Sequence, residues 1–221
     1  MAENKELDIA ESYGKAEEFI NQNKQTVTTI AIAIAVLIGG YYYYASVYMP
    51  QQEKEAQAQI YLGQIYFEND SLNLALNGDG NFLGMLYVAD EYSGTKAGDL
   101  ANYYAGLCYL RLGDYRQAID FLKEFDGEDM IVSTLALGAI GDAYMELNDA
   151  ENGVKYYTMA MEKNQNEFST PILMLKTGMA LEKQEKLGDA KEIYEQIKKD
   201  YPESQEGKDI DKYIARIDAR M

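Results

Sequence analysis

The sequence contains no histidine and a single cysteine, Cys108, among its 221 residues. Histidine is the usual general base near neutral pH and the commonest metal ligand, and a lone cysteine cannot form an intramolecular disulfide. Cys108 lies inside an apolar helical pattern, which favours a small buried hydrophobic residue over a nucleophile. Because no nucleophile–histidine pair and no His/Cys metal site can be assembled, we expect no enzyme activity and no cofactor or metal. Chemistry by carboxylates alone is the alternative, but no motif supports it.

Basic residues are also few. The chain has 20 Lys and Arg residues against 37 Asp and Glu residues, a net charge of −17. Residues 53–221 alone hold 17 basic and 31 acidic residues, which leaves −14 on that segment. An acidic domain repels a phosphate backbone, so we expect no nucleic-acid partner.

One long uncharged run stands out against this polar background. Residues 25–52 contain no charged side chain, and a bilayer-spanning helix needs about 20 mostly apolar residues. The run is longer than the apolar core of a signal peptide, and the residues before it are acidic where a signal peptide would be basic. A buried helix of a soluble protein is the alternative, but no apolar partner surface accompanies it. We therefore predict a transmembrane helix at 25–50 after a short tail, 1–24.

The residues around this span indicate its orientation. Lys15 and Lys24 precede it, whereas only Lys54 follows closely, and positive residues favour the cytoplasmic side. The tail is therefore expected in the cytoplasm, with a short helix over 3–23. Five tyrosines at the far end are typical of the headgroup region: Tyr41, Tyr42, Tyr43, Tyr44 and Tyr48.

The rest of the chain repeats one register four times, starting from Gly63, Gly106, Gly141 and Gly178. A large residue follows each glycine by three positions: Tyr66, Tyr109, Tyr144 and Leu181. A small residue follows by twelve: Ala75, Ala118, Gly153 and Ala190. Small residues let the two helices of a hairpin approach closely. Between them, a polar pair is expected to end the first helix and cap the second: Asn69-Asp70, Gly113-Asp114, Asn148-Asp149 and Gly188-Asp189.

This pattern resembles the tetratricopeptide repeat, a helix–turn–helix unit of 34 residues. The resemblance rests further on Tyr157, Ala160, Tyr194 and Pro202. It implies an all-α fold in which a single N-terminal transmembrane helix precedes an α-solenoid over 51–221. A glycine-rich stretch at 77–84 is expected to break the second helix of the first unit. The predicted units are 56–98 (degenerate), 99–132, 134–167 and 171–204, with a polar-faced C-terminal capping helix at 206–220.

In this architecture the first helix of each unit lines a concave surface. Methionine and tyrosine there suit a partner helix or an unfolded segment. An equally weighted alternative is that some of these side chains pack in the core. The Lys/Asn/Arg set that clamps a C-terminal carboxylate in some family members is missing. The candidate protein-binding groove consists of Tyr103, Leu107, Leu110, Arg111, Asp142, Met145, Leu175 and Met179.

An anchor followed by acidic repeats also resembles the YfgM-like family of ancillary SecYEG translocon subunits. That resemblance implies a single-pass protein of the bacterial inner membrane with its repeat domain in the periplasm. The implied protein partners are translocon subunits, a periplasmic chaperone or unfolded client segments. An alternative function is a scaffold that docks one folded partner of an envelope complex.

Overall fold

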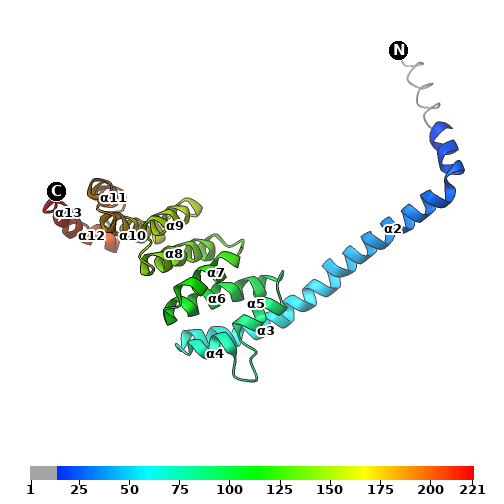
Figure 1. The fold of residues 1–221 in the computed structure, drawn as a ribbon, viewed down its shortest axis with the longest axis horizontal. Coiled ribbons are helices and arrows are strands. Elements are labelled where there is room, and N and C mark those ends of the chain that lie inside the picture. Colours follow the sequence, from blue (N-terminus) through cyan, green and yellow to red (C-terminus); the bar gives the residue numbers. More distant parts are fainter. Residues whose placement is uncertain (1–13) are drawn as a thin grey trace, which may run out of the picture. The chain divides into compact units, whose positions relative to one another are not determined.

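The computed structural model describes residues 14–221, and within this range every regular element is helical. The chain divides into two compact units, residues 1–51 and 52–221 (Figure 1). The predicted all-α fold, an apolar N-terminal helix followed by a helical repeat domain, is confirmed. Each unit is described separately below.

The N-terminal unit consists of helical segments without a core. Residues 14–22 are helical, α2 spans Lys24–Tyr43, and a π-helical turn follows at Tyr44–Tyr48. The rest of the helix predicted over 3–23, residues 3–13, lies outside the described residues. α2 has no buried residue, and one helix here is long and apolar enough to cross a membrane. Apolar side chains such as Leu37, 71% exposed, therefore have no protein to pack against, which suits a lipid environment.

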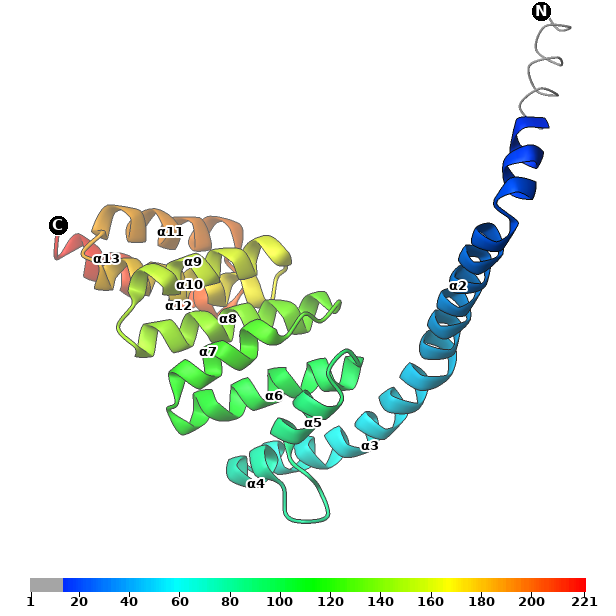
Figure 2. The ribbon, with the colours of Figure 1, turned by 45° about the vertical axis from the view of Figure 1, so that its right-hand side comes forward.

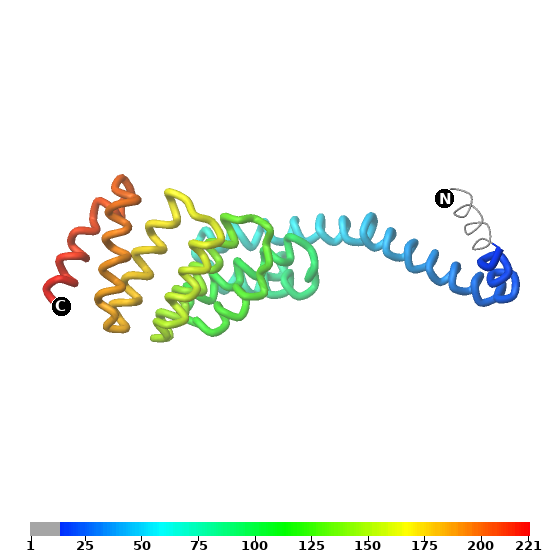
Figure 3. Tube along the Cα trace, turned by 90° about the horizontal axis from the view of Figure 1, so that it is seen from above, coloured from blue at the N-terminus to red at the C-terminus, as the bar shows by residue number. Residues whose placement is uncertain are grey.

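The repeat domain is a series of helical hairpins (Figure 2). Its first unit is irregular, with α3 (Met49–Glu68), α4 (Leu72–Asn77) and α5 (Met85–Glu91). Three regular hairpins follow: α6 (Lys96–Leu112) with α7 (Tyr115–Glu124), α8 (Met130–Glu146) with α9 (Ala150–Lys163), and α10 (Ser169–Lys183) with α11 (Leu187–Asp200). Figure 3 shows the hairpins succeeding one another toward the C-terminus.

All three regular hairpins begin a few residues before the predicted unit boundaries, and in two of them a side-chain cap lies directly upstream of the first helix. Thr95 caps α6 by accepting a hydrogen bond from the Gly98 amide at 2.9 Å. Asp129 caps α8 by accepting from the amides of Ile131 and Val132 at 2.8 and 2.9 Å. Such caps satisfy amides that the first helical turn leaves without partners.

All four hairpin turns place a residue with positive φ seven positions after the register glycine. These residues are Asp70, Gly113, Asn148 and Glu185, with φ of 55°, 83°, 60° and 57°. The prediction that Gly188-Asp189 forms the fourth turn is wrong, because both residues lie inside α11. The position of the turn is thus set by the number of residues after the register glycine. Glu185 takes the left-handed conformation although glycine would adopt it more easily.

In the regular units the register glycines accommodate side chains of the second helix, and at Gly106 the backbone nitrogen of Leu122 also comes close, at 3.1 Å from an added β-carbon. In the regular units the occupant comes sixteen residues after the glycine. A β-carbon at Gly106 would lie 2.5 Å from Leu122 Cγ, and one at Gly141 would lie 2.5 Å from Tyr157 Cδ1. At Gly178 it would overlap the ring of Tyr194, which is fully buried.

In the first unit, different residues pack beside the register glycine, because the second helix is broken at 78–84, as the glycine-rich stretch predicts. Asp79 organises the break: its carboxylate accepts from the amides of Asn81 and Phe82, and from the Tyr66 hydroxyl at 2.5 Å. These hydrogen bonds, that of Phe82 first, lower the pKa of Asp79 to about 2. Phe82 and Met85 then fill the space beside Gly63.

The C-terminal cap is two short helices, α12 (Gln205–Asp209) and α13 (Asp211–Asp218), where the sequence predicts one. Ile210 interrupts them and is fully buried, as is Ile217. Glu182 on α10 fixes the cap: its carboxylate accepts from Arg216 at 2.5 Å and from Arg220 at 2.9 Å. Burial acts to raise the pKa of Glu182, but these cations and the Tyr194 hydroxyl outweigh it and hold that pKa below its ordinary value.

Candidate protein-binding groove

The first helices of the three regular units, α6, α8 and α10, line one open groove of about 450 Å³. Two residues of second helices, Tyr115 on α7 and Tyr157 on α9, complete its walls. The full lining is Leu110, Tyr115, Asp142, Met145, Glu146, Tyr157, Lys176 and Met179. Because three repeat units contribute, the groove exists only in the assembled solenoid.

A charged network crosses the groove and joins consecutive units. The Lys176 ammonium donates to both carboxylate oxygens of Asp142, at 2.8 and 2.7 Å. The Tyr157 hydroxyl donates to the same carboxylate at 2.7 Å. Burial raises the pKa of Tyr157, and the charge of Asp142 raises it further, so the hydroxyl stays a donor. The network fixes α10 against α8 and leaves little net charge at the centre of the groove.

Outside this network the groove has an acidic edge, where the Tyr115 hydroxyl donates to Glu146 at 3.4 Å, and an apolar, adaptable part. Met179 is 45% exposed, and Met145 and Leu110 are partly buried beside it. Methionine is unbranched and polarisable, so it adjusts to side chains of different shape. A lining of this kind can take the apolar face of a helix or the side chains of an extended segment.

The structure divides the eight predicted groove residues into two groups. Leu110, Asp142, Met145 and Met179 lie together in the groove. Tyr103 is only 9% exposed and contacts Phe125 at a ring-centroid distance of 5.5 Å, so it belongs to the core.

The other three predicted residues also face protein. Leu107 and Leu175 are half-buried and pack against core clusters. The Arg111 guanidinium stacks over the Phe67 ring at 4.1 Å and donates to the Phe67 carbonyl, which joins α6 to α3. Tyr103 thus packs in the core, and Leu107 and Leu175 pack partly against it. Which of the eight residues bind a partner stays a prediction.

Sequence reasoning missed Tyr115, Tyr157 and Lys176 as groove residues. Tyr115 and Tyr157 belong to second helices, whereas the sequence analysis took groove residues from first helices only. Lys176 lies two positions before Gly178. The equivalent residues of the other regular units, Tyr104 and Ala139, are uncharged, so the repeat pattern does not predict a charged groove residue there.

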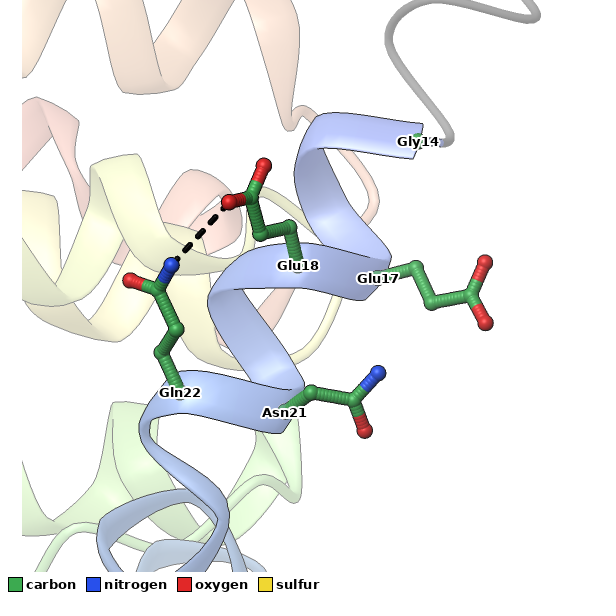
Figure 4. Close-up of a pocket in the computed structure, with 5 residues that line it drawn as sticks. All are labelled: Gly14, Glu17, Glu18, Asn21 and Gln22. Carbon is green, nitrogen blue, oxygen red and sulfur yellow. Dashed lines mark hydrogen bonds between the residues drawn. The ribbon is translucent and has the colours of Figure 1, made fainter.

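A second surface depression lies on the helical segment 14–22 (Figure 4). Its residues all come from this one segment: Glu17 and Asn21 point to one side, and Gln22 donates to Glu18 at 3.1 Å on the other. A single helix encloses no ligand, so the groove of the repeat domain is the stronger candidate site.

Comparison with known families supports the repeat assignment. Two stretches, residues 100–126 and 173–204, match the tetratricopeptide repeat family. They correspond to the predicted units 99–132 and 171–204, and α8 with α9 forms the same hairpin between them. No curated protein matches the chain. The two matched stretches and the helical hairpins identify tetratricopeptide repeats within the chain, and such repeats are typically modules that bind other proteins and are not enzymes.

Proposed function

We propose that this protein is held in the bacterial inner membrane by its N-terminal helix and uses the groove across α6, α8 and α10 to bind segments of other proteins. The observation that carries the proposal is the groove itself, whose apolar part, with Met145 and Met179, is contributed by successive repeat units. Each unit adds binding surface next to the last, so an extended segment or a helix can contact several units at once.

The finer proposal is an ancillary role at the secretory translocon. The acidic repeat domain behind a single apolar helix resembles the YfgM-like family, which implies a periplasmic domain beside SecYEG that acts with a chaperone on emerging chains. The distribution of Lys15, Lys24 and Lys54 supports a cytoplasmic tail and a periplasmic repeat domain. Protease added to intact cells should leave the domain uncut, whereas protease added to spheroplasts should digest it. If protease digested the domain only when it was added to inverted vesicles, whose outer surface is the cytoplasmic face, the opposite topology would be supported.

Photo-crosslinking from the groove tests the binding role. A photoreactive amino acid replaces Met179, and a matched control carries it at Met159, a methionine of similar exposure, 39% against 45%, outside the groove lining. We expect position 179 to give adducts with translocon subunits, a periplasmic chaperone or several secretory chains, and position 159 to give few. A single folded envelope protein as the adduct would instead support a dedicated scaffold. Equal adducts at both positions would argue against the groove.

A further inference from the structure

The charges that line the groove across α6, α8 and α10 do not balance. The Lys176 ammonium is matched by the Asp142 carboxylate, which accepts two hydrogen bonds from it, and the two side chains are only 37% and 34% exposed. Glu146 is exposed and forms no ion pair with any residue of the range 14–221. Its carboxylate accepts only the long hydrogen bond from the Tyr115 hydroxyl at 3.4 Å. The groove therefore keeps one uncompensated negative charge, at Glu146.

Two cations next to the groove do not offset this charge. Arg111 is held against the Phe67 ring, as described above. Lys183 donates to the Asn148 side chain at 2.8 Å and to the Met145 carbonyl at 3.4 Å. Its ammonium thus interacts with the C-terminal end of α8, where the helix carbonyls carry a partial negative charge. Both cations are engaged within the repeat domain, so a cation for the acidic edge of the groove has to come from a bound segment.

The apolar part of the groove continues along α8 and α10, away from this carboxylate. Leu135 and Ile172 are 49% and 43% exposed. Each lies seven residues, or two helical turns, before a groove residue on the same helix face, Asp142 and Met179 respectively. Glu146 and Leu135 are separated by about 16 Å along α8, at 1.5 Å per residue. An extended polypeptide covers that length in about five residues.

We propose that the groove selects apolar polypeptide segments that carry a basic residue at one end. The basic side chain pairs with Glu146, and the apolar side chains pack on Met145 and Met179 and continue toward Leu135 and Ile172. This inference rests on the proposed binding role of the groove and adds the class of segment that it prefers. Charge complementarity of this kind contributes specificity more than raw affinity.

Asp142 acts as the specificity-determining residue of the same site, because it neutralises Lys176. Without its carboxylate, Lys176 would present an unpaired ammonium and would attract an acidic segment. With it, and with the Tyr157 hydroxyl donating to the same carboxylate at 2.7 Å, an acidic segment gains nothing from Lys176. An acidic side chain near Glu146 would be repelled. Residues 53–221, with a net charge of −14, add a field that also favours basic segments.

Three soluble peptides that differ in one residue test this preference. Each has leucines at alternate positions, blocked termini, and lysine, glutamine or glutamate as its first residue. Binding to the full-length protein in phosphatidylcholine nanodiscs is measured by fluorescence anisotropy, and empty nanodiscs give the lipid background. We expect the lysine peptide to bind about threefold more tightly than the glutamine peptide, and the glutamate peptide about threefold more weakly. Both differences should shrink in about 0.5 M salt, which screens the charges.

Four variants assign the preference to particular residues. Glu146→Gln should abolish it, because the exposed side chain keeps its shape and loses its charge. Glu192→Gln, the matched control at an exposed glutamate of α11 outside the groove lining, should leave it unchanged. Asp142→Asn should strengthen binding of the glutamate peptide about twofold, because Lys176 loses its counter-charge. Lys176→Gln should shift the preference further toward the lysine peptide, because the Asp142 carboxylate becomes uncompensated. Melting temperatures check that each variant is folded.

Met179→Glu separates failure of this inference from failure of the proposed function. If the three peptides bind equally well and Met179→Glu weakens all of them, the groove binds segments and the charge preference is refuted. If Met179→Glu weakens none of them, the groove is not the binding site and both proposals fail. Tightest binding of the glutamate peptide, or a preference that survives Glu146→Gln, would refute the role of Glu146. If the folded Asp142→Asn and Lys176→Gln variants do not shift the preference in opposite directions, Asp142 does not determine specificity.

Discussion

The contact between Gly178 and Tyr194 makes the repeat register directly testable by adding one methyl group. In Gly178→Ala the new β-carbon would overlap the Tyr194 ring. That ring is fully buried, and its hydroxyl is held by Glu182 at 2.7 Å. The ring therefore cannot swing into solvent, and the helices α10 and α11 must separate to admit the methyl group.

Two opposing effects determine how much Gly178→Ala changes the free energy of unfolding. Alanine is favoured over glycine inside a helix by about 1 kcal/mol. Overpacking of a filled core costs about 1–3 kcal/mol and sometimes more. Because three ring atoms lie within 3.0 Å of the added carbon, we expect the overpacking to win by ~1–2 kcal/mol. For a domain of this size, that corresponds to a fall in melting temperature of about 2–8 °C. Gly178→Leu should lower the melting temperature more than Gly178→Ala.

Gly188→Ala is the matched control, since Gly188 lies in α11 of the same unit and a β-carbon there would meet nothing within 4 Å. It should stabilise the domain by roughly 0.5–1 kcal/mol. Thermal unfolding of the full-length protein in detergent, followed by circular dichroism, measures both variants. If Gly178→Ala melted at or above the wild-type temperature, the packing of Tyr194 against Gly178 and the register built on it would be wrong.

Three further variants probe the cap, a turn and the irregular first unit. Glu182→Gln should loosen the cap and speed amide exchange over 205–220, at a cost of about 1–3 kcal/mol, because Arg216 and Arg220 are partly solvated. Glu185→Gly should be close to neutral by thermal unfolding, since glycine suits its φ of 57° but the substitution removes the hydrogen bond that Glu185 accepts from Arg220 at 3.0 Å. The folded pKa of Asp79, about 2, lies below its ordinary 3.8, so its stabilisation is complete above about pH 4 and is lost as pH falls toward 2. Asp79→Asn should therefore flatten acid unfolding curves in that window.

The sequence was sufficient to predict the helical hairpins and their small residues, because the register glycines recur with the aromatic residues that pack beside them. It misplaced the fourth turn because Gly188-Asp189 has the composition of a turn, whereas helix length puts the left-handed residue at Glu185. Composition gives no signal for a glutamate in that conformation.

The candidate site was predicted only in part, because spacing along the chain does not specify contacts between repeat units. The register determines which residues face the concave side, so Leu110, Met145 and Met179 could be found from spacing alone. The pair of Lys176 with Asp142 joins residues 34 positions apart through the stacking of two units, and the bonds from Arg216 and Arg220 to Glu182 do the same for the cap. Such contacts depend on the angle between units, which spacing along the chain does not specify.

Binding of an unfolded polypeptide to the groove tests the central claim most directly. The full-length protein in lipid nanodiscs is titrated with a reduced, carboxymethylated secretory protein, and the same titration is made with Met145→Glu/Met179→Glu. Both methionines lie in the groove; Met179 is 45% exposed, whereas Met145 also packs against the core cluster that contains Tyr157. The fold of the double variant is therefore checked by circular dichroism, and Met179→Glu alone is titrated beside it. We predict that the variant binds at least tenfold more weakly than the wild-type protein. Equal affinity of the two proteins, with both fully folded, would contradict the claim that this groove is the binding site.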